Sequence, residues 1–325
     1  LLNVVVYGGL MELWFDDNLI EEEQWGRTVE RLQSETGDFI EDETVCRALI
    51  TKELVSAVKQ RMPQSKFGIF LSGGLDSSLL TLIAQQLKGQ FICYTAGFGE
   101  AKDAAFARKA AESLGVEWKL KLLTIDEVET YIQKAVAIMK PVQLVDPVSV
   151  GVSAVLMAAV DLARADGVTT FFGGLGAEEI FGGYHRHVEA EDVHEECWRG
   201  LKAMWGKDFV RDAALAKALG ITVLTPFLDE KLITAAMRVP GKYKIVDGAQ
   251  KSVIFGTSKS ADFAGERKVI LRKAAEELGL VKEIAWRKKS AAQYGSSFDK
   301  ALEKLAKKHG FKDKGLYLKS IRKAF

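Results

Sequence analysis

A chain of 325 residues, 48% of them hydrophobic and 27% charged, has enough apolar side chains for one large domain or two ordinary ones. Its formal net charge of +1 gives no electrostatic reason to expect a nucleic-acid partner. Three widely spaced cysteines without a C-x-x-C pair argue against a disulfide framework and favour a reducing compartment.

The two ends of the chain carry opposite charge. Residues 1–43 hold twelve acids and two arginines, whereas residues 298–325 hold nine Lys or Arg and three acids. Two interpretations remain open, namely two solvated faces or two surfaces that meet within a chain or across a dimer. No secretory signal is visible, and the longest apolar stretch, Val148 to Val160, is too short to span a bilayer. We therefore expect a cytoplasmic protein without a membrane partner.

Strands and helices alternate through the first half of the chain. In chain order, the patterns predict a hairpin at 2–15, a helix near 41–62, a strand at 67–71 with an apolar helix after it, a strand at 90–96, a helix at 101–114, a strand at 117–123, a helix at 125–139, a helix that starts near Pro147 and a strand at 168–172. From about Tyr184 onward the pattern is mostly helical. This order predicts an α/β fold with a parallel, doubly wound sheet.

The predicted organisation has two parts. Residues 1–44 form an acidic segment with the hairpin, and residues 45–325 form the main domain, of which about 198–325 is a helical extension. Ligands of parallel sheets bind at the carboxyl ends of the strands. Two glycine-containing loops, at 72–78 and 173–184, fall at such ends and are the candidate site.

The first loop, SGGLDSS at 72–78, lies between an apolar strand and an apolar helix. Adjacent glycines let the backbone approach an anion, and the helix behind them directs free amide groups at it. A carboxylate at Asp76 repels phosphate unless it holds a magnesium ion between itself and the phosphates. The loop is therefore typical of a nucleotide pyrophosphate site, with a plain tight turn as the alternative.

The second loop, GGLGAEEIFGGY at 173–184, places two adjacent acids among five glycines. It is either a capped turn or a second source of carboxylate for the same magnesium ion. In that position a carboxylate would let one metal bridge protein and phosphate oxygens as pyrophosphate leaves.

The string SGGLDSS after a strand resembles the signature loop of the N-type ATP pyrophosphatases. The second loop is similar to S-G-E-G-S-D-E-V-F-G-G-Y of the asparagine synthetase and beta-lactam synthetase branch. Three more blocks resemble that branch: TPFLD at 225–229, ERKVILR at 266–272 and WRKK at 286–289 followed by QYG at 293–295. The order and spacing hold from about residue 45 to 298. The chain resembles standalone asparagine-synthetase-related proteins without a glutaminase domain.

The resemblance implies ATP and Mg²⁺ as cofactors and assigns roles to residues. It places Asp76 and Glu178 on magnesium and Lys289 on pyrophosphate and the charge of the adenylate, and it leaves open whether Lys268 and Arg272 face the site or cover a helix. The nucleotide-binding set that it implies is Leu71, Ser72, Gly73, Gly74, Asp76, Ser77, Ser78 and Gly174.

Two departures from the family pattern affect the reaction. Leu175 stands where the family has the glutamate of G-E-G, which lies near the substrate and the amine, and leucine cannot accept a proton. Glu179 is a poor replacement because the family has an acid there too, whereas Tyr184 could contribute a hydroxyl, as a tyrosine does in the beta-lactam branch. The chain also has only about 44 residues before the synthetase region, so we expect no glutaminase domain and no ammonia made from glutamine.

The resulting expectation is a ligase that activates an aspartate-like carboxylate as an acyl-adenylate and passes it to ammonia or an amine. We expect a homodimer and allow for a separate glutaminase subunit. Two alternatives are an ATP-binding regulatory subunit that has lost acyl transfer and adenylylation of a base in RNA, although a nucleic-acid partner is not expected. A further alternative is a zinc site formed by His185, His187, His194 and Cys197, whose spacing allows one.

Overall fold

The computed structural model describes residues 14–15, 18–246, 265–288 and 292–324. The chain folds into two compact units that are interleaved in sequence. Unit 1 comprises residues 1–61, 174–205 and 225–280, and unit 2 comprises residues 62–173, 206–224 and 281–325. The predicted division at residue 44 stays a prediction.

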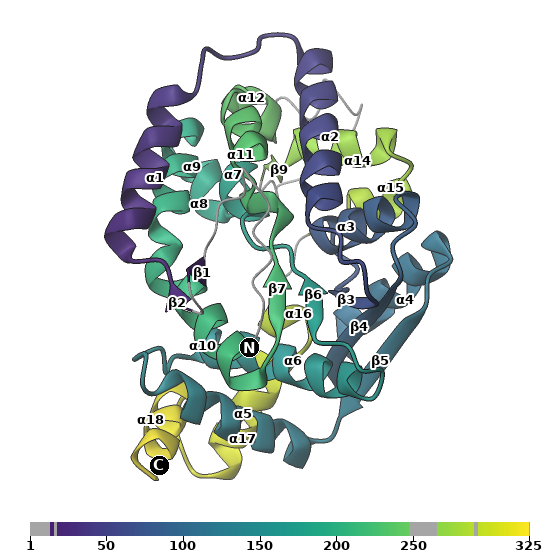
Figure 1. The fold of residues 1–325 in the computed structure, drawn as a ribbon. Helices are drawn as coiled ribbons and strands as arrows, with labels where there is room; N and C mark the ends of the chain where they lie inside the picture. The colour runs from purple at the N-terminus through teal and green to yellow at the C-terminus, as the bar shows by residue number, and fades with distance from the viewer. Residues whose placement is uncertain (1–13, 16–17, 247–264, 289–291, 325) are drawn as a thin grey trace, which may run out of the picture. The chain divides into compact units, whose positions relative to one another are not determined.

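Unit 2 contains a five-stranded parallel sheet, which confirms the predicted α/β class (Figure 1). Its strands lie in the order β5-β4-β3-β6-β7, so the direction of winding reverses between β3 and β6, as in a doubly wound sheet. The strands are β3 (Phe67–Phe70), β4 (Phe91–Phe98), β5 (Trp118–Leu123), β6 (Thr170–Phe172) and β7 (Thr222–Leu224). The strand β7 was not predicted from the sequence.

Most helices of unit 2 lie in the connections between these parallel strands or after the last of them. Right-handed connections place α3 and α4, which lead from β3 towards β5, on the face opposite α5 and α6, which lead back to β6. Their bounds are α3 (Leu75–Gln86), α4 (Lys102–Leu114), α5 (Ile125–Met139), α6 (Pro147–Arg164), α10 (Val210–Leu219), α15 (Lys282–Ala285), α16 (Ala292–Gly295), α17 (Phe298–Lys308) and α18 (Lys314–Ala324). The predicted helices at 101–114 and 125–139 and the proline start of α6 are confirmed.

Local signals fix the ends of these helices. Gly115 ends α4 in the left-handed conformation, with φ +64°. Thr124 and Glu127 form a capping box at the start of α5, and the Asp146 side chain accepts hydrogen bonds from two amide groups at the start of α6. These caps explain why the boundaries of α4, α5 and α6 follow the sequence closely.

In the part of the chain that the structure describes, α6 alone is both long and apolar enough to cross a membrane. Just over half of its 18 residues are buried inside the protein. The helix contributes Val150, Ala154 and Met157 to a core shared with β4, α5 and α17. These contacts are those of a central helix in a folded core, as predicted for the apolar stretch from Val148 to Val160.

Unit 1 is mostly helical. Its elements are β1 (Trp14–Phe15), β2 (Asn18–Leu19), α1 (Glu22–Glu35), α2 (Glu43–Gln60), α7 (Ala177–Ile180), α8 (His185–Glu189), α9 (Val193–Ala203), the 3-10 turn η2 (Pro226–Leu228), α11 (Glu230–Met237), α12 (Gly241–Lys244), β8 (Ile245–Val246), β9 (Glu266–Arg267) and α14 (Val269–Glu277). A short π-helix, η1 (Trp205–Phe209), leads from unit 1 to α10. The predicted hairpin lies almost wholly outside the described residues, and the helix near 41–62 is confirmed as α2.

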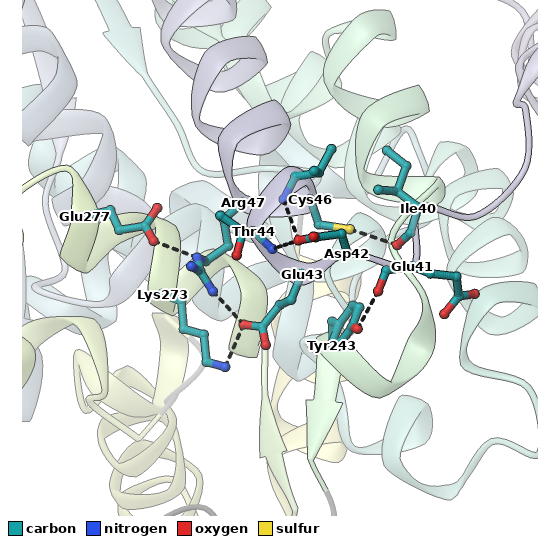
Figure 2. A network of polar contacts seen from close by, with 11 residues as sticks. Ile40, Glu41, Asp42, Glu43, Thr44, Cys46, Arg47, Tyr243, Lys273 and Glu277 are labelled. Carbon is teal, nitrogen blue, oxygen red and sulfur yellow. Dashed lines mark hydrogen bonds and ion pairs between the residues drawn. The ribbon is translucent and has the colours of Figure 1, made fainter.

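Figure 2 shows how the acidic N-terminal segment is held in unit 1. The Glu43 carboxylate accepts hydrogen bonds from Arg47 at 3.0 Å and from Lys273 of α14 at 2.6 Å. Arg47 also pairs with Glu277 at 2.6 Å, so α2 and α14 are joined by alternating charges. Lys308 in the basic C-terminal segment pairs instead with Asp126 and Glu129 of unit 2. Glu43 and Lys308, from the acidic and the basic end of the chain, are therefore each paired within their own unit.

All three cysteines are free and fully buried, at 0% exposure. Cys46 and Cys197 belong to unit 1, and Cys93 lies in β4 of unit 2. Burial raises the pKa of all three thiols, that of Cys93 to about 12. The side chains are therefore protonated and inert in the folded protein.

Candidate functional site

The first loop begins where β3 ends, and β4 fixes its starting point. The amide of Leu71 donates to the carbonyl of Tyr94 at 3.0 Å, and the Thr95 hydroxyl donates to the carbonyl of Leu71. Trp118 of β5 in turn donates its indole N–H to the Thr95 hydroxyl at 2.8 Å. The loop therefore leaves the carboxyl edge of the sheet from a rigid position.

Three serine side chains lie within the first loop. The Ser77 hydroxyl accepts from the amide of Ser72 at 3.2 Å and lies 3.1 Å from the Ser72 hydroxyl, which accepts from the amide of Gly74 at 3.3 Å. The hydroxyl of Ser78 is buried and has no hydrogen-bond partner among the residues that the structure describes. Gly74 is the N-cap of α3 and supplies no side-chain cap, so the amino end of this 12-residue helix is suited to an anion.

Gly73 is the position at which this loop needs a glycine. Its φ of +67° lies in the left-handed region. A Cβ atom on Gly73 would lie 2.2 Å from the carbonyl carbon of Phe106 and 2.4 Å from the amide nitrogen of Ala107, both backbone atoms of α4. The loop therefore passes directly against the backbone of a neighbouring helix, which only a residue without a side chain allows.

A buried ion pair between Arg287 and Asp103 supports the first loop. Arg287 donates from Nη1 to the carbonyl of Ser72 at 2.7 Å and from Nη2 to Asp103 at 2.6 Å. Both side chains are 6% exposed, and the guanidinium lies 4.0 Å from the centre of the Phe106 ring. Burial raises the pKa of Asp103 although Arg287 opposes the shift. A Cβ atom on Gly295 would lie 2.2 Å from the Asp103 carboxylate oxygens, so this glycine makes room for the pair.

The family resemblance implies that this loop binds ATP, and on that expectation Asp103→Asn should raise the KM for ATP about tenfold, with a smaller fall in the maximal rate of pyrophosphate–ATP exchange. The substitution removes the negative charge that pairs with the buried Arg287 guanidinium, and a guanidinium that relaxes no longer holds the carbonyl of Ser72. Exchange kinetics at varied ATP concentrations measure both quantities.

The matched control is Asp208→Asn, which removes one partner of the buried Arg211 in the same unit but away from the loop. It should lower stability while leaving the KM for ATP as in the wild type. Equal KM values in the Asp103 variant and the wild type would contradict a role for this pair in positioning Ser72.

The second loop begins at the end of β6, the neighbour of β3 in the sheet. Gly173 still belongs to unit 2, where its amide donates to the carbonyl of Leu224 at 2.9 Å. From Gly174 onward the loop belongs to unit 1. Gly176 adopts φ +98° at the N-cap of α7, and a Cβ atom there would lie 2.6 Å from Leu228 of η2.

Glu178 lies in α7 and forms an ion pair with Lys268 at 2.6 Å. The side chains are 13% and 4% exposed, respectively. Arg272, one turn along α14 from Lys268, donates instead to the carbonyl of Arg267 at 2.8 Å. Of the two residues whose orientation the sequence left open, Lys268 therefore contacts a predicted site residue. Glu179 is buried near Gly200 of α9, and its suitability as a replacement acid is not tested by this position.

Tyr184, the residue before α8, is held between two side chains. Its ring stacks on His187, with centroids 5.8 Å apart, and the guanidinium of Arg186 lies 4.1 Å from its centre. His187 accepts at Nδ1 from the amide of Tyr184 at 3.1 Å. The predicted catalytic role of the Tyr184 hydroxyl stays a prediction.

The zinc alternative receives no support. Among residues 14–15, 18–246, 265–288 and 292–324, no group of three or more His, Cys, Asp or Glu side chains could hold a metal ion. His187 bonds to Tyr184, and the Nε2 atom of His194 accepts from Trp198 at 3.0 Å. Cys197 lies 3.7 Å from the Lys244 ammonium group.

A magnesium ion fits the chemistry of the two predicted ligands. Asp76, in the first turn of α3, and Glu178 both offer carboxylate oxygens, the ligands that Mg²⁺ prefers. Asp76 lies in unit 2 and Glu178 in unit 1. The carboxylate of Glu178 already holds an ammonium group, so a metal ion there would compete with Lys268. Lys289 lies outside the described residues.

A family model described as Asparagine synthase matches residues 49–193 and 187–315 of the chain. The putative glutamine-hydrolyzing asparagine synthetase 1 of Methanocaldococcus jannaschii is 31% identical over 280 residues, 80% of this chain and 51% of that protein. The glutamine-hydrolyzing asparagine synthetase 1 of Lotus japonicus is 28% identical over 204 residues, 59% of this chain and 34% of that protein. The chain thus spans about half the length, or less, of these two relatives.

Two solved structures also align with the chain at a low level. The NMN synthetase of Francisella tularensis is 15% identical with a TM-score of 0.31, over 73% of this chain and 94% of that one. The NAD+ synthetase of Burkholderia pseudomallei is 14% identical with a TM-score of 0.31, over 89% of this chain and 96% of that one. A TM-score of 0.31 is too low to establish a shared fold.

Proposed function

Because the chain belongs to the asparagine synthase family, a family that uses ATP, we propose that it is an ATP- and Mg²⁺-dependent ligase. It would activate a carboxylate as an acyl-adenylate and transfer the acyl group to ammonia. The observation that carries this proposal is the first loop. Gly73 brings its backbone against α4, Arg287 holds Ser72, and the amino end of α3 has no side-chain cap, which suits it to an anion.

The chemistry needs two transfers. A carboxylate oxygen of the substrate attacks the α-phosphorus of ATP, the bond to the β-phosphate breaks, and pyrophosphate leaves with the bonding electrons. The nitrogen of ammonia then attacks the acyl carbon, AMP leaves with its phosphate oxygen, and the nitrogen loses a proton. The chain would orient the phosphates through the backbone of Gly73 and Gly74, while Lys289 would stabilise charge as pyrophosphate departs.

Magnesium, held by Asp76 and Glu178, would neutralise phosphate charge when bound. Aspartate is the substrate that we propose, and free ammonia the nitrogen donor, with a separate glutaminase subunit as an alternative supply. Three buried free thiols support a reducing cytoplasmic location. The homodimer stays a prediction.

The test is isotope exchange between pyrophosphate and ATP, measured with Mg²⁺ and a panel of acids that includes aspartate. Exchange that depends on one acid would identify the substrate of the first transfer. Amide formation with ammonium then tests the second transfer. If no acid supports exchange, the chain does not form an acyl-adenylate, and the proposal fails.

Leu175 favours a second candidate, an ATP-binding regulatory subunit that has lost acyl transfer. Leucine offers neither a general base nor a group that binds ammonium. The two candidates differ at the second transfer, because a regulatory subunit that has lost acyl transfer would bind ATP but would form no amide with ammonium.

We expect Leu175→Glu to raise ammonia-dependent amide formation about tenfold, while acid-dependent exchange persists. A carboxylate at this position would supply the proton acceptor that the second transfer needs, and such a group contributes roughly 10²–10⁴-fold where it acts as a general base. Leu175→Gln, which adds a polar side chain of the same length without a base, is the control. An equal gain in both variants would show that a carboxylate is not what this position lacks.

A further inference from the structure

Lys268 adopts an unusual backbone conformation. It lies at the N-cap of α14 with φ +57° and ψ +32°, a left-handed conformation that is strained for a residue with a side chain. Its side chain is 4% exposed, and its ammonium group lies 2.6 Å from Oε1 of Glu178. The pairs Ile245–Arg267 and Val246–Glu266 join β8 to β9 immediately before it. The strained residue is therefore held by a short sheet, and its ammonium group contacts the Glu178 carboxylate.

Gly183 shows how closely the second loop surrounds this pair. A Cβ atom on Gly183 would lie 1.7 Å from Oε2 of Glu178 and 2.4 Å from Cε of Lys268. Its amide donates to the carbonyl of Glu178 at 2.7 Å, and its carbonyl accepts from Arg267 at 3.1 Å. The ion pair thus lies against bare backbone, in space that any other residue at position 183 would occupy.

Burial of this pair needs an explanation beyond stability. Removing two charges from water is unfavourable, and the attraction between them often only offsets that cost. Here the arrangement also requires a left-handed lysine and a glycine. In the proposed function, the carboxylate that Lys268 neutralises is the predicted metal ligand Glu178, which makes the ammonium an internal substitute for a divalent cation.

We propose that Lys268 is a positioning residue that occupies Glu178 in place of a divalent cation and is displaced when the cation binds. This inference rests on the proposed function, because it takes the metal role of Glu178 from there. The Glu178 carboxylate then accepts either an ammonium group or a metal ion. Lys268 keeps the carboxylate oriented before metal arrives and sets how tightly the metal is held.

The first test is thermal melting of the full chain with and without Mg²⁺, in the absence of nucleotide. Lys268→Met removes the ammonium group that pairs with the buried Glu178 carboxylate, so this variant should melt below the wild type and be stabilised by Mg²⁺ more than the wild type is. Lys273→Met is the matched control on the same helix. Its partner Glu43 keeps Arg47 as a counter-charge (Figure 2), so Mg²⁺ should not restore it. Equal Mg²⁺ shifts in the two variants would overturn the proposal.

A second variant covers the case in which Lys268→Met does not fold. Lys268→Arg keeps the charge, but a guanidinium binds a carboxylate with two hydrogen bonds and is harder to displace. Titration of Mn²⁺, followed by the electron paramagnetic resonance of the free ion, should show about tenfold weaker binding to Lys268→Arg than to the wild type. Unchanged affinity would contradict exchange between lysine and metal.

The thermal melting and the Mn²⁺ titration use neither ATP nor a carboxylic acid substrate. The absence of pyrophosphate exchange would therefore overturn the ligase proposal without touching the metal result. Equal Mn²⁺ affinity in the wild type and Lys268→Arg would overturn the role of Lys268 while leaving the ligase proposal in place.

Discussion

Gly73→Ala is expected to reduce pyrophosphate–ATP exchange by about 10²-fold or more. The left-handed φ of +67° alone costs a residue with a side chain roughly 1–2 kcal/mol. The added methyl group would also overlap backbone atoms of Phe106 and Ala107, 2.2 Å and 2.4 Å away, and backbone cannot rotate aside as a side chain can. The first loop must therefore move, and displaced amide donors cost roughly 10²–10³-fold in sites that stabilise charge.

Gly115→Ala is the matched control, because it separates conformational strain from overlap. Gly115 has nearly the same φ, +64°, but a Cβ atom there would have nothing within 4 Å, and the residue precedes β5 at the opposite edge of the sheet. Its alanine variant should lose about 1 kcal/mol of stability and keep wild-type exchange. Exchange by Gly73→Ala at the wild-type rate would show that the first loop does not bind the phosphates.

We expect about 3 kcal/mol of folding stability to be lost between pH 6.5 and pH 4 through His187 alone. His187 is fully buried, and burial, assisted by the nearby charge of Arg186, lowers its pKa from 6.5 to about 4. In this pH window the unfolded chain binds a proton that the folded chain does not. Stability therefore falls as the pH falls. Burial also lowers the pKa of His194, which acts in the same direction.

Urea denaturation at a series of pH values measures this effect as the difference between the wild type and His187→Gln. Other groups of the chain titrate equally in both proteins, so the difference isolates His187. The wild type should lose more stability on acidification than the variant does. His185→Gln, at an exposed histidine in the same helix, controls for the substitution itself. Parallel pH profiles for the wild type and His187→Gln would refute the assignment.

The sequence predicts the sheet of unit 2 well because its strands are apolar runs separated by capped helices. The ends of these helices are fixed by nearby residues, namely Gly115, the Thr124 capping box and Asp146. Such short-range signals are visible in the sequence. The strand β7 escaped prediction for the converse reason. It is three residues long, none of them fully buried, within a region that is otherwise helical, and it forms only because β6 offers a free edge.

The ion pairs that support the candidate site could not be predicted from local sequence patterns. Asp103 and Arg287 are 184 positions apart, and Glu178 and Lys268 are 90 apart, so no periodicity links them. The family resemblance indicated Lys268 without assigning its partner, and nothing in the sequence singled out Asp103. The zinc alternative shows the opposite error. His187 and His194 are close in sequence, but the helices α8 and α9 direct them to Tyr184 and Trp198.

The three buried thiols allow the opening of each unit to be measured separately. A thiol reagent reaches a fully buried cysteine only when the structure around it opens, so the labelling rate measures the free energy of that opening. Cys93, in β4 against Thr81, would record the parallel sheet, whereas Cys46 and Cys197 would record unit 1. Quantifying the three modified peptides after brief exposure would thus give separate stabilities for two parts of one chain, without introducing a label.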